Sequence, residues 1–446
     1  MDTSLSLVLN ETLRQNDLES NARTYSRLVT NNITSGTGTT ISDNEDNVYI
    51  DFLAGAGTLA LGHNHPIVLR ELNEFLQSGQ ILHGLDLITP IKRKFSETII
   101  SLFPSEWRDE LKMHYCSPSG ADATEAAIKL FKTATNRSSV IAFHGAYHGM
   151  TNGAISLTGN LAIKNPISNL MPGVHFLPYP YLYRSPYGVG ENESIDISLY
   201  HIRSTLSDSS SGITKPAVII VEAIQGEGGC IPAPARWLKG LNCICKELDI
   251  PLVLDEIQCG IGRSGDMFAF EESGIQPDAI LLSKAVGGGL PMSILVYNRK
   301  YDCWESGAHT GTFRGNQLAM AAGCATLDIV NQPLFLNDVN KKGKLFKNLL
   351  DNLKSKFSQI GDVRGRGLML GLELIDPVKK NTLGEPLSNG LLAKKIKTNC
   401  YKNGLIIETG GRDDSVIRFL PPLNVEIAVI YQAVSILEYA LISETK

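Results

Sequence analysis

Residues 252–265 read LVLDEIQCGIGRSG, an apolar run that ends in two acidic residues and leads into three glycines. The apolar part is typical of a strand in a parallel sheet, because both faces of such a strand are covered by helices. Asp255 stands at the end of this run, where a buried carboxylate needs a specific partner of positive charge. The stretch therefore predicts a parallel sheet with a functional acid at one edge.

Similar apolar runs recur on both sides of this stretch and alternate with segments of helical pattern. They occupy residues 112–116, 139–143, 217–224, 251–257, 278–283 and 293–297. Strands that alternate with helices in this way indicate an α/β domain with a mostly parallel sheet. We expect this large domain to span residues 61–330.

The two ends of the chain show a different pattern. Residues 334–356 read as one long amphipathic helix, and the segment after it mixes short strands with a helix near 390–401. The N-terminal residues are too few to bury a core of their own. We expect residues 1–60 and 331–446 to form a second, smaller α+β domain together.

Composition limits the classes of function that remain. The chain has 446 residues and a net charge of -5, without a basic run that contains aromatic residues, so we expect no nucleic-acid partner. Eight cysteines in a chain of this length indicate reduced thiols rather than a disulfide framework. Without a membrane span or a signal peptide, a cytoplasmic enzyme that does not bind membranes is expected. Cys243 and Cys245 lack the partners of a zinc site, so we also expect no metal.

The glycines of the opening stretch allow one alternative. Gly260, Gly262 and Gly265 have the G-x-G-x-x-G spacing of a dinucleotide-binding loop, which would indicate a nicotinamide-dependent dehydrogenase. In that fold the first glycine follows the strand directly, and a crossover helix opens at the third. Here Asp255 and the four residues after it intervene, and the segment after Gly265 is short and aromatic. Both features disfavour the dinucleotide interpretation.

A lysine follows the next apolar run, in LLSKAVGGGLP. Consecutive parallel strands end at the same edge of a sheet, so we expect Lys284 and Asp255 to lie close together. An amine between apolar walls has a lowered pKa and becomes nucleophilic toward an aldehyde. A carboxylate opposite it would keep a pyridinium nitrogen protonated. Lys284 and Asp255 therefore suit pyridoxal 5′-phosphate (PLP) as a cofactor.

Two motifs in this region identify a family. DEIQCGIGRSG and SKAVGGGLPMS resemble the paired signatures of the class III aminotransferases, and other motifs follow in the family's order from about residue 36 to 425. The resemblance implies the type I fold of PLP-dependent transferases, with a seven-stranded-type sheet in the large domain. It also implies the transfer of a terminal amine to an oxo acid. A scaffold that keeps only the fold remains an alternative, although Lys284 and Asp255 are retained.

The resemblance also implies which residues bind the cofactor. SPSGADATEAAIKL is similar to the family's phosphate loop, which assigns the phosphate to Gly120 and Ala121 at the start of a helix. Tyr147, in FHGAYHGMT, would stack on the pyridine ring, with Ile257 on the opposite side. Gln258 would form a hydrogen bond with the phenolic oxygen of the cofactor.

Further motifs concern the substrates and the subunit interface. VEAIQGEGG and VIRFLPPL are similar to family segments in which an acid, Glu227 here, pairs with an arginine, Arg418 here. Arg418 would bind the α-carboxylate of an oxo acid, and Glu227 would neutralise Arg418 when the donor presents an amine. Thr312, in HTGTFRGNQ, would reach the phosphate of the neighbouring subunit, which implies a homodimer.

Two departures from the family pattern concern the choice of substrate. Met150 stands where ornithine-type members have an arginine that holds the distal carboxylate, and Arg314 in TFRGN is a candidate replacement. HGLDLITP and GTFRGNQLAMAAG resemble the branch that acts on L-2,4-diaminobutyrate with 2-oxoglutarate, in which Arg23 and Tyr25 would line the entrance. The products would be L-aspartate 4-semialdehyde and L-glutamate. Ornithine, acetylornithine and 4-aminobutyrate remain alternative donors.

Overall fold

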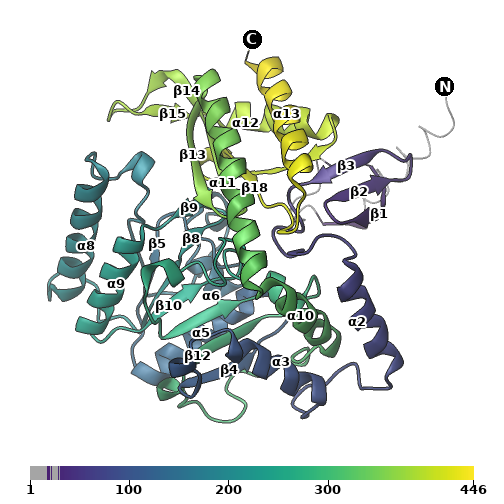
Figure 1. The fold of residues 1–446 in the computed structure, drawn as a ribbon. Coiled ribbons are helices and arrows are strands. Elements are labelled where there is room, and N and C mark those ends of the chain that lie inside the picture. Colours follow the sequence, from purple (N-terminus) through teal and green to yellow (C-terminus); the bar gives the residue numbers. More distant parts are fainter. Residues whose placement is uncertain (1–17, 21, 23–28, 30, 446) are drawn as a thin grey trace.

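The structure is a computed structural model that describes residues 18–20, 22, 29 and 31–445. A large sheet with its helices forms the lower part of the molecule in Figure 1, and smaller sheets with the C-terminal helices form the upper part. The residues that end the strands of the large sheet therefore determine where a site can form.

The large sheet has seven strands in the order β4-β12-β11-β10-β7-β5-β6. The strands are β4 (Leu111–Tyr115), β5 (Val140–Phe143), β6 (Val174–Leu177), β7 (Val218–Glu222), β10 (Leu252–Asp255), β11 (Ala279–Leu282) and β12 (Ile294–Asn298). All neighbours are parallel except for β12, which runs antiparallel to both β11 and β4. The predicted α/β fold with a mostly parallel sheet is confirmed, although the edge strand β6 was not predicted.

Helices surround this sheet. The α-helices are α2 (Pro66–Gln77), α3 (Pro90–Ser101), α4 (Ser105–Arg108), α5 (Gly120–Thr135), α6 (Asn152–Ser156), α7 (Leu161–Lys164), α8 (Glu191–Ser207), α9 (Ala235–Glu247) and α10 (Gln317–Val330). Short 3₁₀ helices are η1 (Leu182–Arg184), η2 (Glu271–Ser273), η3 (Lys284–Gly287) and η4 (Arg299–Tyr301). A two-stranded ribbon joins β8 (Ile224–Gln225) to β9 (Ile231–Pro232).

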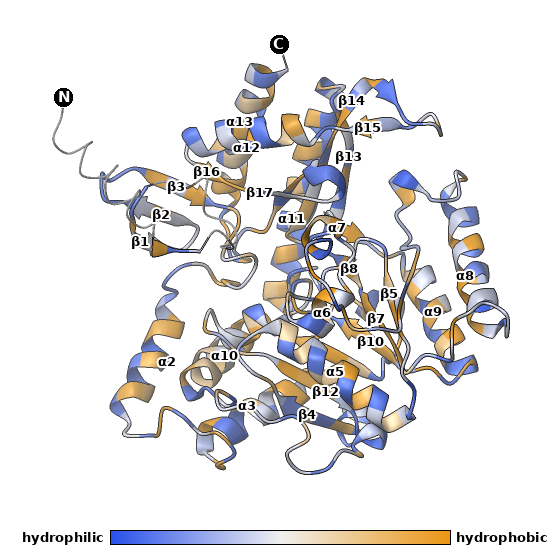
Figure 2. Cartoon of the chain, turned by 180° about the vertical axis from the view of Figure 1, so that it is seen from behind, coloured by the Kyte–Doolittle hydropathy of each residue, from blue (hydrophilic) through white to orange (hydrophobic). Residues whose placement is uncertain are grey.

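Both faces of the large sheet are covered, which explains the continuous apolar runs. On β7, Val218 and Ile220 belong to the same buried cluster as the apolar residues of α5. Ile219 and Val221 point to the other face and belong to the cluster that contains the buried residues of α9. Figure 2 shows hydrophobic colours on β7 and β10 in the middle of the sheet. No polar face is needed on these strands, because neither side meets water.

The upper part of the molecule combines residues from both ends of the chain. Its helices are α11 (Pro333–Lys356), α12 (Gly390–Lys402) and α13 (Ile427–Glu444), with η5 (Arg412–Asp414). Its strands are β1 (Ile33–Thr37), β2 (Thr40–Asp43), β3 (Val48–Asp51), β13 (Ile360–Arg366), β14 (Met369–Lys380), β15 (Pro386–Ser388), β16 (Leu405–Ile406), β17 (Glu408–Gly410) and β18 (Val416–Phe419). The N-terminal β3 pairs in parallel with the C-terminal β16. The domain limits at residues 60/61 and 330/331 stay predictions.

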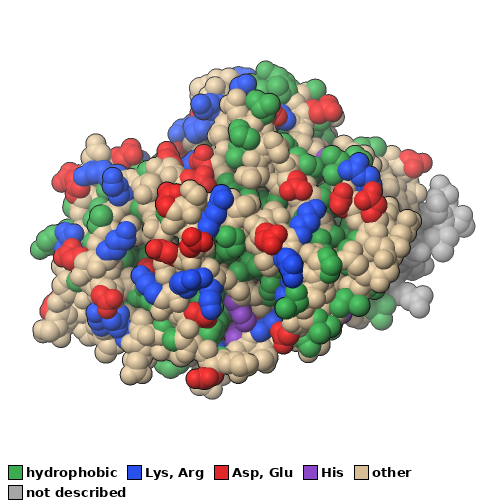
Figure 3. Space-filling model, turned by 60° about the horizontal axis from the view of Figure 1, so that its bottom comes forward, with side chains coloured by type: hydrophobic (Ala, Val, Ile, Leu, Met, Phe, Trp, Pro, Cys, Tyr) green, Lys and Arg blue, Asp and Glu red, His purple; other side chains and the backbone are tan. Residues whose placement is uncertain are grey.

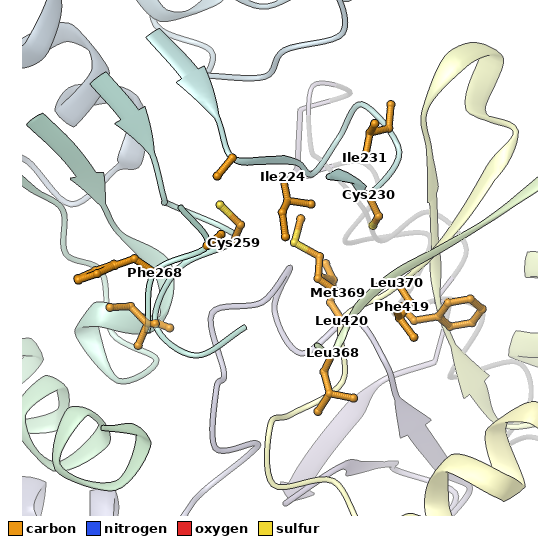
Figure 4. Packing of buried hydrophobic residues seen from close by; sticks show 14 of the residues in the cluster. Ile224, Cys230, Ile231, Cys259, Phe268, Leu368, Met369, Leu370, Phe419 and Leu420 are labelled. Carbon is orange, nitrogen blue, oxygen red and sulfur yellow. The ribbon is translucent and has the colours of Figure 1, made fainter. Parts of the chain in front are cut away.

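The buried core is continuous between the two parts. Ile224 and Cys259, which follow strands of the large sheet, share one cluster with Met369 and Phe419 of the smaller sheet. Figure 4 shows Ile224, Met369 and Leu420 pointing toward one another at this junction. A site built from residues of both parts therefore rests on a packed junction.

The three glycines of the opening stretch contribute to the same junction. No helix opens at Gly265, and a Cβ on it would lie 2.1 Å from Oδ1 of Asn340 in α11. The buried Arg263 donates hydrogen bonds to the carbonyls of Leu368 and Pro421. The segment therefore fits against the C-terminal part of the chain, which is not the arrangement of a dinucleotide-binding loop.

The surface carries mixed charges, and the C-terminal helix α13 is long and apolar. Figure 3 shows basic and acidic side chains interspersed on the face that it presents. Among the described residues, α13 alone is long and apolar enough to cross a membrane. A core helix meets the same criterion, and α13 buries Val434, Leu437 and Leu441 while it packs on α12 and α11. The helix is therefore weak support for a membrane span.

Candidate active site

The C-terminal ends of β7, β10 and β11 lie beside a cavity of about 410 Å³. It is lined by every residue that the sequence predicts for the cofactor except Thr312: Gly120, Ala121, Tyr147, Asp255, Ile257, Gln258 and Lys284. Glu227 and Met150 also line it. A larger hollow of about 720 Å³ lies between α12 and the end of α13, but its walls contain none of these residues. The predicted cofactor residues therefore place the candidate active site in the cavity of about 410 Å³.

Lys284 follows β11 and begins η3. Its φ of 49° lies in the left-handed region, which is uncommon for a residue with a side chain and is found at sites where the surrounding structure imposes it. Burial lowers the pKa of the Lys284 amine, although the charges of Glu227 and Asp255 act in the opposite direction. A larger fraction of the amine is therefore neutral, and nucleophilic, than in a solvated lysine.

Asp255 is the last residue of β10, and its carboxylate is 3% exposed. Its Oδ2 lies 2.7 Å from Nδ1 of His148, and its Oδ1 accepts a hydrogen bond from the backbone N–H of Ile257 at 3.0 Å. Burial of the His148 ring acts to lower its pKa, but the hydrogen bond and charge of Asp255 raise the pKa above the ordinary value. The pair therefore places a shared proton at the bottom of the cavity.

His148 is a functional residue that the sequence reasoning missed. The structure places His144 in an exposed turn and His148 in the buried loop that follows it. The partner of His148 lies 107 residues away along the chain. A local motif could not reveal it, because the contact depends on the order of strands in the sheet.

A second carboxylate, Glu222, ends the neighbouring strand β7 and is aligned with Asp255 in the register of the parallel pair. Its oxygens accept hydrogen bonds from the backbone N–H groups of Tyr147 at 3.0 Å and Gly226 at 2.8 Å. Burial raises the pKa of Glu222 to about 7. The signal that points to Asp255, an acid at the end of an apolar run, is also present in VIIVE and could have identified Glu222.

The start of α5 forms one wall of the cavity. Ser119 caps the helix by accepting a hydrogen bond from the backbone N–H of Ala121 at 3.3 Å, and Asp122 holds the turn by accepting one from Ser117 at 2.7 Å. A Cβ on Gly120 would lie 2.9 Å from Cδ1 of Ile257, so a larger residue here would displace the Ile257 side chain in the cavity wall. The backbone N–H groups that point out of this helix end, together with the helix dipole, make it suitable for a phosphate.

Two buried polar atoms in the cavity walls indicate that a polar ligand belongs there. Gln258 donates from Nε2 to the carbonyl of Ala56 at 3.1 Å, whereas its Oε1 has no hydrogen-bond partner among the described residues. Nε2 of His148 likewise has none within the described part of the chain. Buried polar atoms without partners are rare in folded proteins. With an amine, a helix N-terminus and a buried acid in one cavity, these residues fit PLP.

Arg418 and Glu227 form an ion pair beside the cavity. Nη2 of Arg418 lies 2.8 Å from Oε1 and 2.9 Å from Oε2 of Glu227. Arg418 is 1% exposed although it lies on β18, while the side chain of Glu227 is 27% exposed. Both charges act on the pKa of Lys284, which places them near its amine. The pairing that the sequence resemblance implied is present in the structure.

The remaining predicted residues lie elsewhere. Thr312 is exposed and does not line the cavity of its own chain. Arg314 is buried behind the phosphate turn: a Cβ on Gly311 would lie 3.0 Å from Oγ of Ser117 and 3.3 Å from Nε of Arg314. Its Nε and Nη2 have no hydrogen-bond partner among the residues that the structure describes.

The structure does not test the two entrance residues or the expected absence of a metal. Arg23 and Tyr25 lie outside the described residues. In the described part of the chain, no group of three or more His, Cys, Asp or Glu side chains is arranged to hold a metal ion. The expected absence of a metal therefore stays a prediction.

Comparisons with known proteins agree with this geometry. Residues 21–441 match the family described as aminotransferase class-III. The diaminobutyrate–2-oxoglutarate aminotransferase of Rhizobium meliloti is 48% identical over 94% of this chain and 89% of its own length. The enzyme of the same name from Haemophilus influenzae is 46% identical over 92% and 90%. An amine transaminase structure from an uncultivated Pseudomonas species, in its PLP-bound form, has a TM-score of 0.85 at 25% identity and covers 95% of this chain and 97% of that one. The chain therefore belongs to the class III aminotransferase family.

Proposed function

We propose that this protein is a PLP-dependent aminotransferase that moves the 4-amino group of L-2,4-diaminobutyrate to 2-oxoglutarate. The products are L-aspartate 4-semialdehyde and L-glutamate, and the reaction is reversible. The observation that carries the proposal is one cavity that is lined by Lys284, the His148–Asp255 pair and Glu227, with Arg418 paired to Glu227 beside it. The relatives named for this reaction, at 46–48% identity, support the choice of substrates.

The residues of the cavity have separate roles in this proposal. PLP, when bound, supplies an electron sink that stabilises negative charge on the substrate carbon. Asp255, held by His148, would stabilise positive charge at the pyridine nitrogen of the bound cofactor. The neutral amine of Lys284 would hold the cofactor through its aldehyde carbon, and when it is free of the cofactor Nζ would accept the proton from the substrate carbon as a general base. Asp255 acts as a charged carboxylate and Lys284 as a neutral amine, and the two side chains have different surroundings in the cavity.

The other cavity walls hold the cofactor in position. The backbone N–H groups at Gly120 and Ala121 would hold the phosphate, and Tyr147 and Ile257 would pack against the ring. Gln258 would hold the phenolic oxygen through its side-chain amide, which can accept a hydrogen bond at Oε1 or donate one at Nε2. Together these contacts would orient the cofactor toward the substrate.

Arg418 and Glu227 let one site accept two substrates. 2-Oxoglutarate presents a carboxylate to Arg418, whereas the donor presents an amine, for which the ion pair of 2.8 Å stays closed. Replacing Arg418 with lysine is expected to raise the KM for 2-oxoglutarate about tenfold or more, because lysine cannot form the two-pronged contact. The KM for diaminobutyrate is expected to change less. Equal increases of both KM values in steady-state kinetics would contradict this division.

A homodimer completes the proposal. Thr312 is exposed, and beside it lies an apolar patch that consists of Ile81, Leu82, Leu85, Leu87, Ile88 and Phe313, each between 40% and 83% exposed. The ring centroids of His83 and Phe313 lie 5.9 Å apart, so the segment of residues 81–88 lies against the segment that carries Thr312. An exposed apolar patch of this kind is typical of a protein interface, where Thr312 would reach the partner's phosphate. Light scattering that gives the mass of one chain would contradict the dimer.

The remaining assignments extend the proposal. Arg314 stays the candidate for the distal carboxylate of the donor, with Arg23 and Tyr25 at the entrance. A cytoplasmic location is supported by eight free cysteines, which suit a reducing compartment, and cell fractionation would test it.

The choice of amine donor is tested by a profile of initial rates with 2-oxoglutarate as acceptor. Diaminobutyrate is expected to have a kcat/KM at least about tenfold above those of ornithine, acetylornithine and 4-aminobutyrate, since Met150 lines the cavity without the charge that holds a longer donor. The semialdehyde product should be trapped with an amine reagent and identified by mass. Equal rates with all four donors would favour a general ω-aminotransferase.

A further inference from the structure

Glu222 connects two loops that carry residues of the site. One oxygen of its carboxylate accepts a hydrogen bond from the N–H of Tyr147, and the other accepts one from the N–H of Gly226. Tyr147 forms a wall of the cavity, and Gly226 directly precedes Glu227. The same carboxylate therefore fixes the position of the aromatic wall and the base of the loop that carries the partner of Arg418.

The surroundings of Glu222 make its ionisation sensitive to pH. Asp255 lies beside Glu222 on the neighbouring strand β10, and the charges of both acids raise the pKa of His148. Lys284 is near enough for the charge of Glu222 to affect the pKa of its amine. The other ionisable groups that face it are Tyr179, which donates to its backbone carbonyl at 3.0 Å, and Cys259. Burial, together with the charge of Asp255 and against that of His148, raises the pKa of Glu222 to about 7.

We propose that Glu222 is a positioning residue whose ionised form ties the Tyr147 loop to the Glu227 loop. This inference rests on the proposed function. Both oxygens of the carboxylate accept from N–H donors, and hydrogen bonds to an ionised carboxylate are about twice as strong as those to a neutral carboxyl group. Protonation therefore weakens the link between the two loops, and the cavity holds its aromatic wall and the Arg418–Glu227 pair less firmly.

The active, ionised form of Glu222 increases as pH rises through about 7. The kcat/KM of the native enzyme is therefore expected to rise across this range. The kcat/KM for 2-oxoglutarate should respond together with that for the donor, because Glu222 holds both loops.

The test compares Glu222→Gln with a matched control, Glu256→Gln. Glu256 is also a buried carboxylate whose oxygens accept hydrogen bonds from two backbone N–H groups, those of Ala269 at 2.9 Å and Phe270 at 3.1 Å. Burial raises the pKa of Glu256 to about 8, but the residue does not line the cavity. Both substitutions should therefore lower the temperature of unfolding to a similar extent, and only one should change the pH profile.

Glu222→Gln is expected to lower kcat/KM at pH 8.5 by about tenfold or more, the factor that corresponds to one lost hydrogen bond to a charged group. It should also remove the inflection near pH 7. Glu256→Gln should keep the native profile, and Glu222→Asp, which still ionises, should retain an inflection even if its activity is reduced. An inflection that persists in Glu222→Gln, or that disappears in Glu256→Gln as well, would overturn the inference.

If the Glu222→Gln protein does not fold, the pH profile of Glu222→Asp provides the test. An inflection in that variant at a shifted pH supports the inference, and its disappearance contradicts it. The result is separate from that of the proposed function. If the native enzyme transaminates no donor at any pH, the proposed function fails; if it does so and the variants share its profile, only the role of Glu222 fails.

Discussion

Replacing Lys284 with alanine is expected to abolish transamination, with a loss of about four orders of magnitude or more. General acid–base catalysis by one side chain contributes about 10²–10⁴-fold, and the same amine also acts as the nucleophile toward the aldehyde. The amine is buried at the start of η3 on a backbone that is left-handed, so no other lysine can take its position. The measurement is the rate of glutamate formation from diaminobutyrate and 2-oxoglutarate at saturating PLP.

The control for this substitution is Lys246→Ala, because Lys246 lies exposed near the end of α9. It should leave the rate unchanged. The Lys284→Ala protein should still bind PLP through the start of α5, but sodium borohydride should no longer fix the cofactor to the chain. Adding a small primary amine should restore part of the activity, which a purely structural defect would not allow. A variant that kept more than about one-hundredth of the native rate would exclude the role of Lys284.

Much of the large sheet could be predicted because its strands are buried on both faces. A run such as AVIIVEAI has no polar side, and only a covered parallel strand accommodates that. β7, β10 and β11 begin one residue after the predicted runs and end one or two residues before them, and at the C-terminal ends the side chains reach the cavity. β6 was missed because its residues, VHFL, are only partly buried at the edge of the sheet.

The site could be predicted where a residue stands at the end of an apolar run and not where it depends on a distant partner. Asp255 and Lys284 follow consecutive strands, so chain order alone brings them together. His148 reaches Asp255 only because β5 and β10 both neighbour β7 in the sheet, an order that no local motif contains. The role of Arg314 stays a prediction: its motif adjoins that of Thr312, and its side chain lies near Ser117, just before α5, rather than in the cavity wall.

Asp255→Asn is expected to lower kcat by about two to three orders of magnitude. The asparagine has the same shape but no charge, so it removes the partner that raises the pKa of His148 and that would stabilise a pyridinium nitrogen. Removing one preorganised group that stabilises charge in the transition state costs about 10²–10³ in kcat. KM should change less than kcat, because the substrate contacts Arg418 and Lys284 rather than Asp255.

The matched control for this change is Asp278→Asn, which alters a carboxylate at the opposite edge of the same sheet. Asp278 accepts hydrogen bonds from the backbone N–H of Leu252 at 3.0 Å and from the hydroxyl of Tyr301 at 2.9 Å, away from the cavity. It should lower the temperature of unfolding but not kcat. If both variants lost activity in proportion to their stability, Asp255 would only support the sheet. If Asp255→Asn alone lost activity and also shifted the absorbance of bound PLP, the carboxylate would act on the cofactor itself, since a change in stability does not alter the spectrum of the folded enzyme.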